Sequence, residues 1–198
     1  MRSDSTEKVP GHFVVAITGA SGAIYAKRLL DELAGSKVRV HLIVSGAGEK
    51  ILKLELGLGT RDLVRDDVIR YDYKDFAARV ASGSFPLAGM VIIPCSMGTL
   101  SAVAHGTSIN LIHRCADVCL KEGKKLILVP RETPLNSIHL ENMLKLSKMG
   151  VTILPAMPGF YNKPKTIEDL ADFIVARVLD QLGVSQNLVE AWNGIPQE

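Results

Sequence analysis

Three turns of the sequence place small or hydroxyl-bearing residues directly after an apolar run. The turns are T-G-A-S-G-A at 18–23, Ser45, and C-S-M-G-T at 95–99. Small residues between a strand and a helix let backbone N–H groups approach an anion at the positive end of the helix. Because neither G-x-x-x-x-G-K-[ST] nor G-x-G-x-x-G occurs in these turns, the pattern favours a single phosphate over a nucleoside triphosphate or a dinucleotide. The first turn alone is equally compatible with a tight turn that only packs.

Hydroxyl groups at three strand ends also indicate which phosphate ester would fit. If the strands lie parallel in one sheet, their carboxyl ends share an edge, where open sheets of this kind bind ligands. A rim of neutral donors with little charge suits the phosphate and ribityl chain of flavin mononucleotide (FMN). We therefore predict an FMN site at this edge.

Two cations lie on a predicted helix over residues 110–122. Arg114 and Lys121 are seven residues apart and share a helix face, and Asp117 could pair with either. The two cations could bind an anion together. A solvated, ion-paired face explains the same pattern.

Three further groups are candidates for chemistry. Arg177 falls at the border of the apolar stripe of the last predicted helix, where a guanidinium must reach out to water or hold an anion. Tyr161, in a Pro-Gly-Phe-Tyr loop upstream, could donate to the same anion or simply pack. Glu132 follows Pro130-Arg131 at a strand end, where partial burial beside a phosphate would raise its pKa and let it act as an acid. Arg131 and Glu132 are equally compatible with ordinary loop charges.

Strands and helices alternate along most of the chain. The pattern predicts strands at 13–18, 38–44, 68–71, 90–95, 126–130 and 151–154, and helices at 23–34, 46–56, 110–122, 136–149 and from Thr166, with one more helix after residue 96. Thr166 and Asp169 form a capping box. Short connections between alternating elements favour a three-layer α/β/α fold, Rossmann-like or flavodoxin-like, with a parallel sheet. The sequence leaves the order of the strands open.

Composition argues against several classes of protein. The 198 residues show no composition break, so we expect a flexible tail at 1–11 and one domain at 12–198. A formal net charge of +2 without a basic, aromatic-rich cluster argues against nucleic acid as a partner. No apolar run approaches the roughly 20 residues that span a bilayer, and the start lacks a signal-peptide core. We therefore expect a cytoplasmic protein, and its 47% hydrophobic content favours burial between subunits.

The cysteines and histidines show no metal-binding pattern. Cys95, Cys115 and Cys119 lack paired C-x-x-C spacings, which favours reduced core thiols. The five histidines form neither H-x-x-H nor H-E-x-x-H. We therefore predict no metal.

Several of these segments together resemble the UbiX-type flavin prenyltransferases. The runs are T-G-A-S-G-A-I-Y at 18–25, P-C-S-M-G-T-L-S at 94–101, R-C-A-D-V-C-L-K-E-G at 114–123, L-V-P-R-E-T-P-L at 128–135, I-H-L-E-N-M-L-K-L-S at 138–147 and P-G-F-Y at 158–161. The likeness extends from about Val14 to Trp192. Its most specific part is P-R-E followed by I-H-L-E-N-M.

The resemblance implies a specific reaction. A flavodoxin-like or Rossmann-like domain would join the dimethylallyl group of dimethylallyl monophosphate to N5 and C6 of reduced FMN, with release of phosphate and without a metal. It would assemble as a homododecamer and supply prenylated FMN to a UbiD-type decarboxylase.

The resemblance also assigns roles by position. Glu132 would protonate the departing phosphate, Ser21 would relay protons, and Arg114 and Lys121 would clamp the leaving group. Phe76 stands near a tryptophan of some members, against the prenyl chain, and Gly98 replaces a lysine of others, so donor preference and phosphate affinity stay open. The implied FMN contacts are Gly19, Ala20, Ser21, Ser45, Ser96, Met97, Gly98, Thr99 and Arg131; the implied contacts to the prenyl phosphate are Tyr161, Arg177, Arg114 and Lys121, some of them from a neighbouring subunit.

Two other functions are compatible with the same fold. Homo-oligomeric flavin-containing cysteine decarboxylases also use FMN, but with a histidine that has no counterpart at a strand end here. A non-catalytic FMN-binding protein would bind the flavin without turnover. It would give no reason for a prenyl-phosphate clamp.

Overall fold

The computed structural model describes residues 11–190 and Gly194, so the predicted tail lies outside this range except for Gly11. The described chain folds into a parallel sheet with six α-helices and two short 3-10 helices. The strands are β1 (Gly11–Ile17), β2 (Val38–Val44), β3 (Val68–Tyr71), β4 (Leu87–Cys95), β5 (Lys125–Pro130) and β6 (Thr152–Ile153). The helices are α1 (Ala23–Leu33), α2 (Gly46–Leu56), η1 (Thr60–Leu63), η2 (Arg79–Ala81), α3 (Met97–Ala104), α4 (Leu111–Lys121), α5 (Ser137–Lys148) and α6 (Ile167–Leu182).

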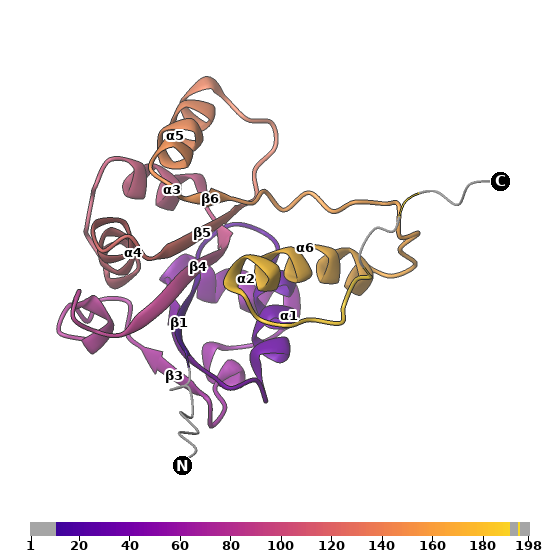
Figure 1. Cartoon of the computed structure of the whole chain (residues 1–198), viewed down its shortest axis with the longest axis horizontal. Helices are drawn as coiled ribbons and strands as arrows, with labels where there is room; N and C mark the ends of the chain where they lie inside the picture. The colour runs from indigo at the N-terminus through magenta and orange to yellow at the C-terminus, as the bar shows by residue number, and fades with distance from the viewer. Residues whose placement is uncertain (1–10, 191–193, 195–198) are drawn as a thin grey trace, which may run out of the picture.

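The six strands run in the order β3-β2-β1-β4-β5-β6, and every pair is parallel (Figure 1). This is the order of Rossmann-type doubly wound sheets, in which the direction of winding reverses between the two central strands. Here the reversal falls between β1 and β4. The structure confirms the predicted three-layer fold and supplies the strand order that the sequence left open.

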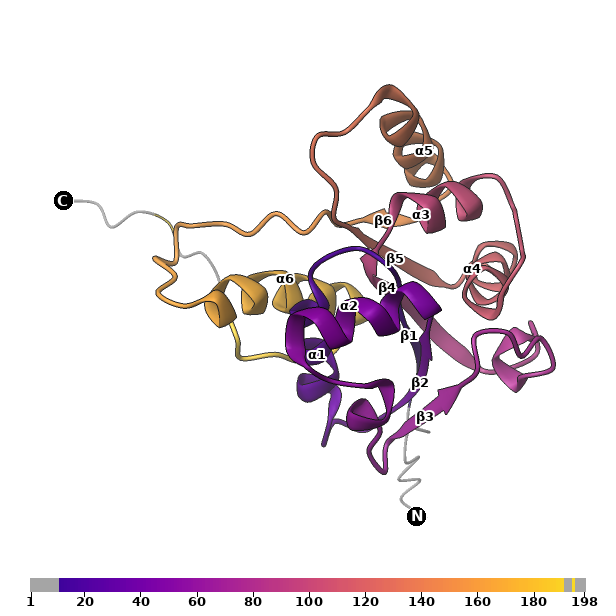
Figure 2. The ribbon, with the colours of Figure 1, turned by 180° about the vertical axis from the view of Figure 1, so that it is seen from behind.

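Two apolar layers cover the sheet. Side chains alternate along β1, so Val14 and Ala16 face one layer while Val15 and Ile17 face the other. The first layer holds α3 and α4, with part of α5, and the second holds α1, α2 and α6 (Figures 1 and 2). Both faces of the central strands are buried, which explains their continuous apolar runs.

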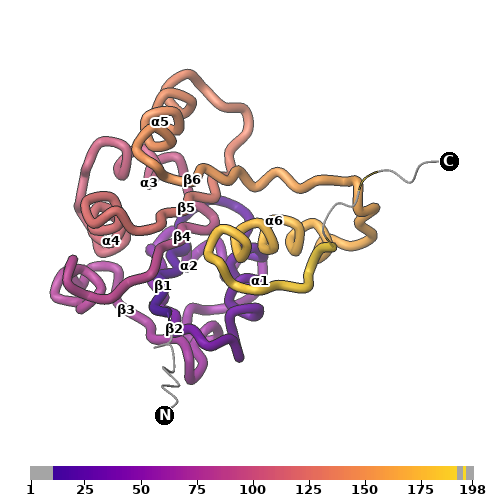
Figure 3. The backbone as a smooth tube through the Cα atoms, viewed as in Figure 1, coloured from indigo at the N-terminus to yellow at the C-terminus, as the bar shows by residue number. Residues whose placement is uncertain are grey.

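Two segments stand away from this body. Residues 155–165, called the arm below, extend far beyond the sheet before α6 returns, and α5 projects on another side (Figure 3). Large apolar side chains on both are exposed, including Met157 at 67%, Phe160 at 68% and Ile138 at 62%. Clustered apolar exposure of this kind marks surfaces that another protein covers.

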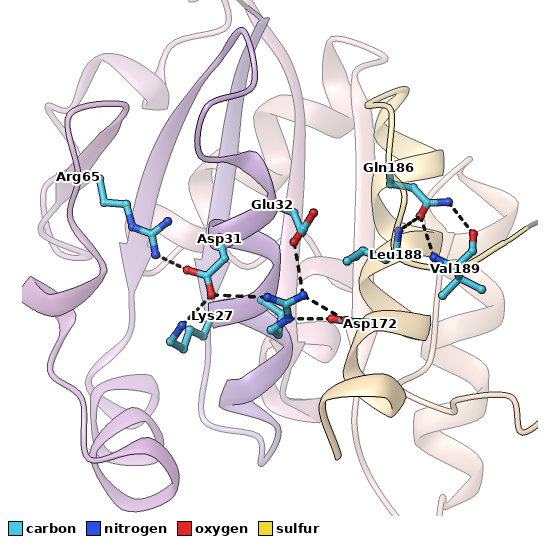
Figure 4. A network of polar contacts seen from close by, with 9 residues as sticks. Lys27, Asp31, Glu32, Arg65, Asp172, Gln186, Leu188 and Val189 are labelled. Atoms are coloured by element: carbon cyan, nitrogen blue, oxygen red, sulfur yellow. Dashed lines mark hydrogen bonds and ion pairs between the residues drawn. The ribbon is translucent and has the colours of Figure 1, made fainter. Parts of the chain in front are cut away.

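Charged residues tie α1 to α6. Arg28 Nε donates to Asp172 Oδ1 over 2.7 Å, and its Nη2 contacts Glu32 at 3.4 Å. Asp31, one helical turn further along, pairs with Lys27 and with Arg65 from the loop before β3 (Figure 4). These bonds fix the start of α6, whose predicted capping box at Thr166 is confirmed.

A chain of three hydrogen-bonded rings lies within the β1–β2–β3 part of the sheet. His12 Nδ1 lies 2.9 Å from His41 Nε2, and His41 Nδ1 lies 3.1 Å from the Tyr71 hydroxyl. His41 is fully buried, and Phe85 packs edge-on against both imidazoles. Burial, followed by the nearby His12, Arg79 and Arg39, lowers the pKa of His41 from 6.5 to about 4.

The free energy of unfolding should therefore depend on pH through His41. In the unfolded chain the imidazole takes up a proton near pH 6.5, whereas in the folded chain it does so only near pH 4. The contribution of His41 to the free energy of unfolding is therefore fully present above pH 6.5. The free energy of unfolding falls by about 3 kcal/mol as the pH drops from 6.5 to 4. Denaturant titrations should show this slope flattened in His41→Gln and unchanged in His105→Gln, an exposed histidine; an equal slope in both variants contradicts the assignment.

Candidate functional site

The crevice of this sheet lies where β1 and β4 end side by side. Thr18, which is buried, follows β1, and its hydroxyl donates to Pro94 O over 2.8 Å. The same oxygen accepts from Ser96 N at 2.8 Å. One side chain thus joins the turn after β1 to the turn after β4. We call the space bordered by these two turns and by the loop after β5 the crevice.

A protein carboxylate occupies the N-terminus of α1. Glu55, from the end of α2, accepts from Gly22 N at 2.9 Å and from Ala23 N at 2.8 Å. Although burial opposes ionisation, hydrogen bonds from Ser21, Ala23 and Gly22, together with the charge of Arg131, lower the pKa of Glu55. In the single chain, the first N–H groups of α1 are therefore bound by a protein carboxylate, and the phosphate expected at this turn stays a prediction.

The helix ends after β2 and β4 carry serine caps. Ser45 Oγ accepts from Gly48 N at 3.0 Å, and Ser96 Oγ accepts from Thr99 N at 3.3 Å while donating to the Thr99 hydroxyl at 3.1 Å. The Ser45 hydroxyl proton and the Thr99 hydroxyl proton are left to donate outward. The first turns of α2 and α3 thus offer neutral donors with positive helix ends.

Two glycines show why the crevice needs small residues. A Cβ on Gly19 would lie 2.5 Å from the Ala47 methyl, so only glycine lets this turn pack against α2. A Cβ on Gly98 would meet nothing within 4 Å. The first position is fixed by packing, whereas the second faces open space at the start of α3.

Arg131 and Glu132 follow β5 at the edge of the crevice. Arg131 Nε donates to Ser21 O over 3.2 Å, which links the loop after β5 to the turn after β1. Glu132 is exposed, so the partial burial expected from sequence is not found within a single chain. Both residues border a cavity of about 230 Å³ whose other walls are mainly apolar, among them Leu135, Met143, Ala156 and Met157.

The predicted clamp residues lie elsewhere. Lys121 ends α4 and precedes β5, whereas Glu132 follows β5, so the six residues of that strand, about 20 Å, separate the two. Arg114 Nε donates to Ala81 O at 3.2 Å and its Nη1 pairs with Asp117 at 2.8 Å. Phe76, 49% exposed, belongs to the segment between β3 and β4 that runs past α4. Within one chain the clamp and the acid do not meet.

Tyr161 and Arg177 form a third group. Tyr161 lies on the arm, and its ring packs edge-on against Phe173 of α6 at 5.7 Å between centroids. Arg177, one turn further along α6, pairs with Asp180 at 3.1 Å, while its Nε is buried without a hydrogen-bond partner among the described residues. An unsatisfied buried donor is costly unless a ligand or another chain accepts from it.

Sequence analysis missed two residues of the crevice. The sequence pattern predicts Thr18 as the last residue of a strand and Glu55 as part of a helix, without a role in the crevice for either. Glu55 lies 33 residues beyond Gly22, and no local pattern links them. Only the reach of α2 back across the turn brings its carboxylate there.

No group of three or more His, Cys, Asp or Glu in the described part of the chain could hold a metal ion. Nor is any helix of the described residues long and apolar enough to cross a membrane. Donors around the crevice are instead hydroxyls, amides and one guanidinium. They suit an organic anion.

Fold and crevice together define an α/β flavoprotein. The model of the family described as Flavoprotein matches residues 1–179. The peptidyl-cysteine decarboxylase EpiD, at 17% identity and a TM-score of 0.60, shares the fold alone.

Closer relatives identify the family more narrowly. The flavin prenyltransferase UbiX of Alkalihalophilus pseudofirmus is 54% identical, over 94% of this chain and 98% of its own. The dodecameric FMN-dependent UbiX-like decarboxylase of Escherichia coli O157:H7 is 45% identical with a TM-score of 0.89, over 92% of this chain and all of that one. AnUbiX, solved with FMN and dimethylallyl pyrophosphate, is 42% identical with a TM-score of 0.90, over 94% of this chain and all of that one. The chain belongs to the UbiX flavin prenyltransferase family.

Removing the Glu55 carboxylate should destabilise the start of α1. Glu55→Ala leaves Gly22 N and Ala23 N without their acceptor, at a cost of about 1 kcal/mol, the usual value of a lost N-terminal cap. Glu55→Gln keeps an acceptor without the charge, so its stability should lie between those of wild type and Glu55→Ala. Chemical denaturation of both variants, with the exposed Glu141→Ala as control, measures the effect; equal stability in Glu55→Ala and wild type would show that the cap is dispensable.

Proposed function

We propose that this protein is a flavin prenyltransferase, which transfers the dimethylallyl group of dimethylallyl monophosphate to N5 and C6 of reduced FMN and releases phosphate. Family membership at 54% identity is the observation that carries this proposal. The local chemistry agrees with it. Neutral donors border one side of the crevice, and a carboxylic acid with an apolar cavity lies on another.

The residues around the crevice fit a flavin phosphate. The hydroxyls of Ser45 and Thr99 and the first N–H groups of α3 are donors without counter-charge, and Gly98 leaves room beside them. Because Glu55 holds the end of α1, the phosphate would bind at the ends of α2 and α3. We assign Gly19, Ala20, Ser21 and Arg131 to the same ligand, as neighbours of this edge.

Glu132 and Ser21 would handle protons. Glu132 lines the mainly apolar cavity, so a prenyl phosphate placed there would find an acid beside its leaving group. Ser21 hydrogen-bonds to Glu55, which couples a hydroxyl in the crevice to an ionised carboxylate. Such a pair can accept a proton from the flavin as the second bond closes.

Separation of the clamp from the acid argues for a homo-oligomer. Arg114 and Lys121 lie on α4, and Phe76 lies in the segment between β3 and β4. Tyr161 and Arg177 lie on the arm and on α6. The apolar exposure of the arm and α5 offers the surfaces that would join copies. We infer a dodecamer, the assembly of the relative from Escherichia coli. In this chain's dodecamer, the clamp of one subunit would face the crevice of another.

The wider setting follows from the reaction. Prenylated FMN is a cofactor rather than an end product, so a UbiD-type decarboxylase would receive it. Its cellular place would be the cytoplasm, where FMN and prenyl phosphates are both present.

Purified protein mixed with reduced FMN and dimethylallyl monophosphate should yield prenylated FMN, detected by its mass. Glu132→Gln cannot protonate the leaving phosphate and should lower turnover at least about 100-fold. Its affinity for FMN should stay within about twofold, because Glu132 is not an FMN donor. The exposed Glu190→Gln is the matched control; wild-type turnover in Glu132→Gln would reject the acid, and absence of the product from wild type would reject the function.

Mixing two inactive variants tests the shared site. Lys121→Ala keeps an intact crevice, and Glu132→Gln keeps an intact clamp. A mixed oligomer therefore contains a complete site wherever the clamp of a Glu132→Gln subunit faces the crevice of a Lys121→Ala subunit. Random assembly should restore about one quarter of the wild-type rate. If the co-expressed variants recover no activity, Lys121 and Glu132 act in the site of a single chain, which would contradict the shared site.

A further inference from the structure

A chain of three rings supports both ends of the segment between β3 and β4. Tyr71 is the last residue of β3, and Phe85 lies two residues before β4 begins. The Tyr71 hydroxyl lies 3.1 Å from His41 Nδ1, and the Phe85 ring lies 5.1 Å, between centroids, from each of the imidazoles of His41 and His12. The two ends of residues 72–85, called the 72–85 segment below, therefore rest on the same pair of imidazoles.

Both nitrogens of the His41 ring have a partner. Nε2 lies 2.9 Å from His12 Nδ1, and Nδ1 lies at the Tyr71 hydroxyl. Because burial lowers the pKa of His41 to about 4, the ring is neutral near pH 7, with one donor and one acceptor. One hydrogen bond at each nitrogen satisfies this ring completely. His41 is fully buried, so an apolar side chain in its place would leave both partners without these bonds.

The titratable and charged groups around these rings come from five elements. They are His12 of β1, Arg39 of β2, Tyr71 of β3, Arg79 of η2 and Cys115 of α4. After burial, the charges of His12 and of the two arginines lower the pKa of His41 further. No carboxylate acts on either imidazole within the described part of the chain. A proton on both imidazoles would place hydrogens on both facing nitrogens and break the bond between them.

The 72–85 segment has little regular structure of its own. Its helix η2 has three residues, and the rest is turn and loop. Its buried side chains are Ala78, Val80, Ala81 and Phe85, of which Phe85 is the largest. The Arg79 guanidinium covers the Phe85 ring, 4.7 Å from its centroid. A segment of this kind keeps its place through a few packing contacts, and the contact of Phe85 with the imidazoles is among them.

Two groups of the proposed function depend on where this segment lies. It carries Phe76, and the carbonyl of Ala81 accepts from Arg114 Nε at 3.2 Å. The carbonyl of Val80 accepts from Cys115 Sγ, on the same helix as Arg114, at 3.4 Å. A shift of the segment would therefore move an aromatic ring and also remove an acceptor of the guanidinium.

We propose that His12, His41 and Tyr71 are positioning residues for the prenyl donor. Their hydrogen bonds hold the 72–85 segment, which in turn places Phe76 and Arg114. This inference rests on the proposed function, which assigns Phe76 and Arg114 to the donor. Because the rings act through the segment, their loss should change the binding of the donor and leave the binding of FMN at the ends of α2 and α3 unaffected.

Steady-state kinetics of His41 variants test this role. His41→Leu removes both hydrogen bonds and should raise the KM for dimethylallyl monophosphate by about tenfold, because a displaced segment no longer places the groups that contact the donor. The Kd for FMN should not change. His41→Gln keeps one donor and one acceptor, so it should restore most of the wild-type KM. The exposed His105→Gln is the matched control.

Hydrogen exchange, measured by mass spectrometry on the FMN-loaded protein, follows the segment directly. Amides of residues 72–85 should exchange faster in His41→Leu than in wild type, whereas those of β5 should keep their rates. After correction for the intrinsic effect of pH, wild type should lose protection in this segment as the pH falls from 6.5 to 4, because an open segment lets His41 take up its proton near pH 6.5. His41→Gln has no imidazole to protonate and should keep its protection.

The two measurements separate this inference from the function. If wild type makes no prenylated flavin, the function fails, yet faster exchange confined to the 72–85 segment still supports the rings as its anchor. Equal exchange in His41→Leu and wild type would overturn the proposal, as would an unchanged KM. A KM and an FMN Kd that rise together would show general loosening and would overturn it too. Tyr71→Phe, which removes a single hydrogen bond, gives the same test if His41→Leu does not fold.

Discussion

The crevice depends on the hydrogen bonds that hold β1 and β4 together where they end. Winding reverses between these strands, so the helices that follow them leave on opposite faces of the sheet and open a gap. Thr18 spans that gap by donating to Pro94 O and accepting from Ser96 N. Because the hydroxyl is buried, both bonds are protected from water. Together with the backbone bond from Thr18 N to Pro94 O, this side chain links the turns that carry Ser21 and Thr99.

Charge is distributed unevenly between the two ends of the sheet. Neutral donors gather at the carboxyl ends of the strands, while Lys121 and Lys124 lie at the amino ends beside the turn at 82–84. A site that binds a flavin, and also the phosphate of a prenyl donor, needs both the neutral donors and the cations. Exposed apolar side chains on the arm and α5 provide the association energy that can bring the two ends of different copies together.

Local patterns were enough to predict the elements of the fold. Residues 38–44 and 68–71 form strands with the predicted bounds, because each is an apolar or β-branched run between turn residues. Strand order was not predictable, since it depends on which layers pack around β1. Candidate site residues next to strand ends could be predicted for the same local reason. The positions of Glu55 and of the buried His41 ring depend instead on contacts between distant segments. Glu132 is exposed in one subunit, so the partial burial predicted for it stays a prediction.

In the proposed function, Glu55 would also keep two anions apart in one site. Each helix that starts at the crevice offers a positive end, and three of them converge there. If all three were open, the flavin phosphate and the donor phosphate could compete for the same N–H groups. With the end of α1 bound to a carboxylate, the flavin tail would bind at the ends of α2 and α3, as proposed above. The donor phosphate would then take its charge from Arg114 and Lys121, as proposed above, and its carbon chain would lie between the two anions.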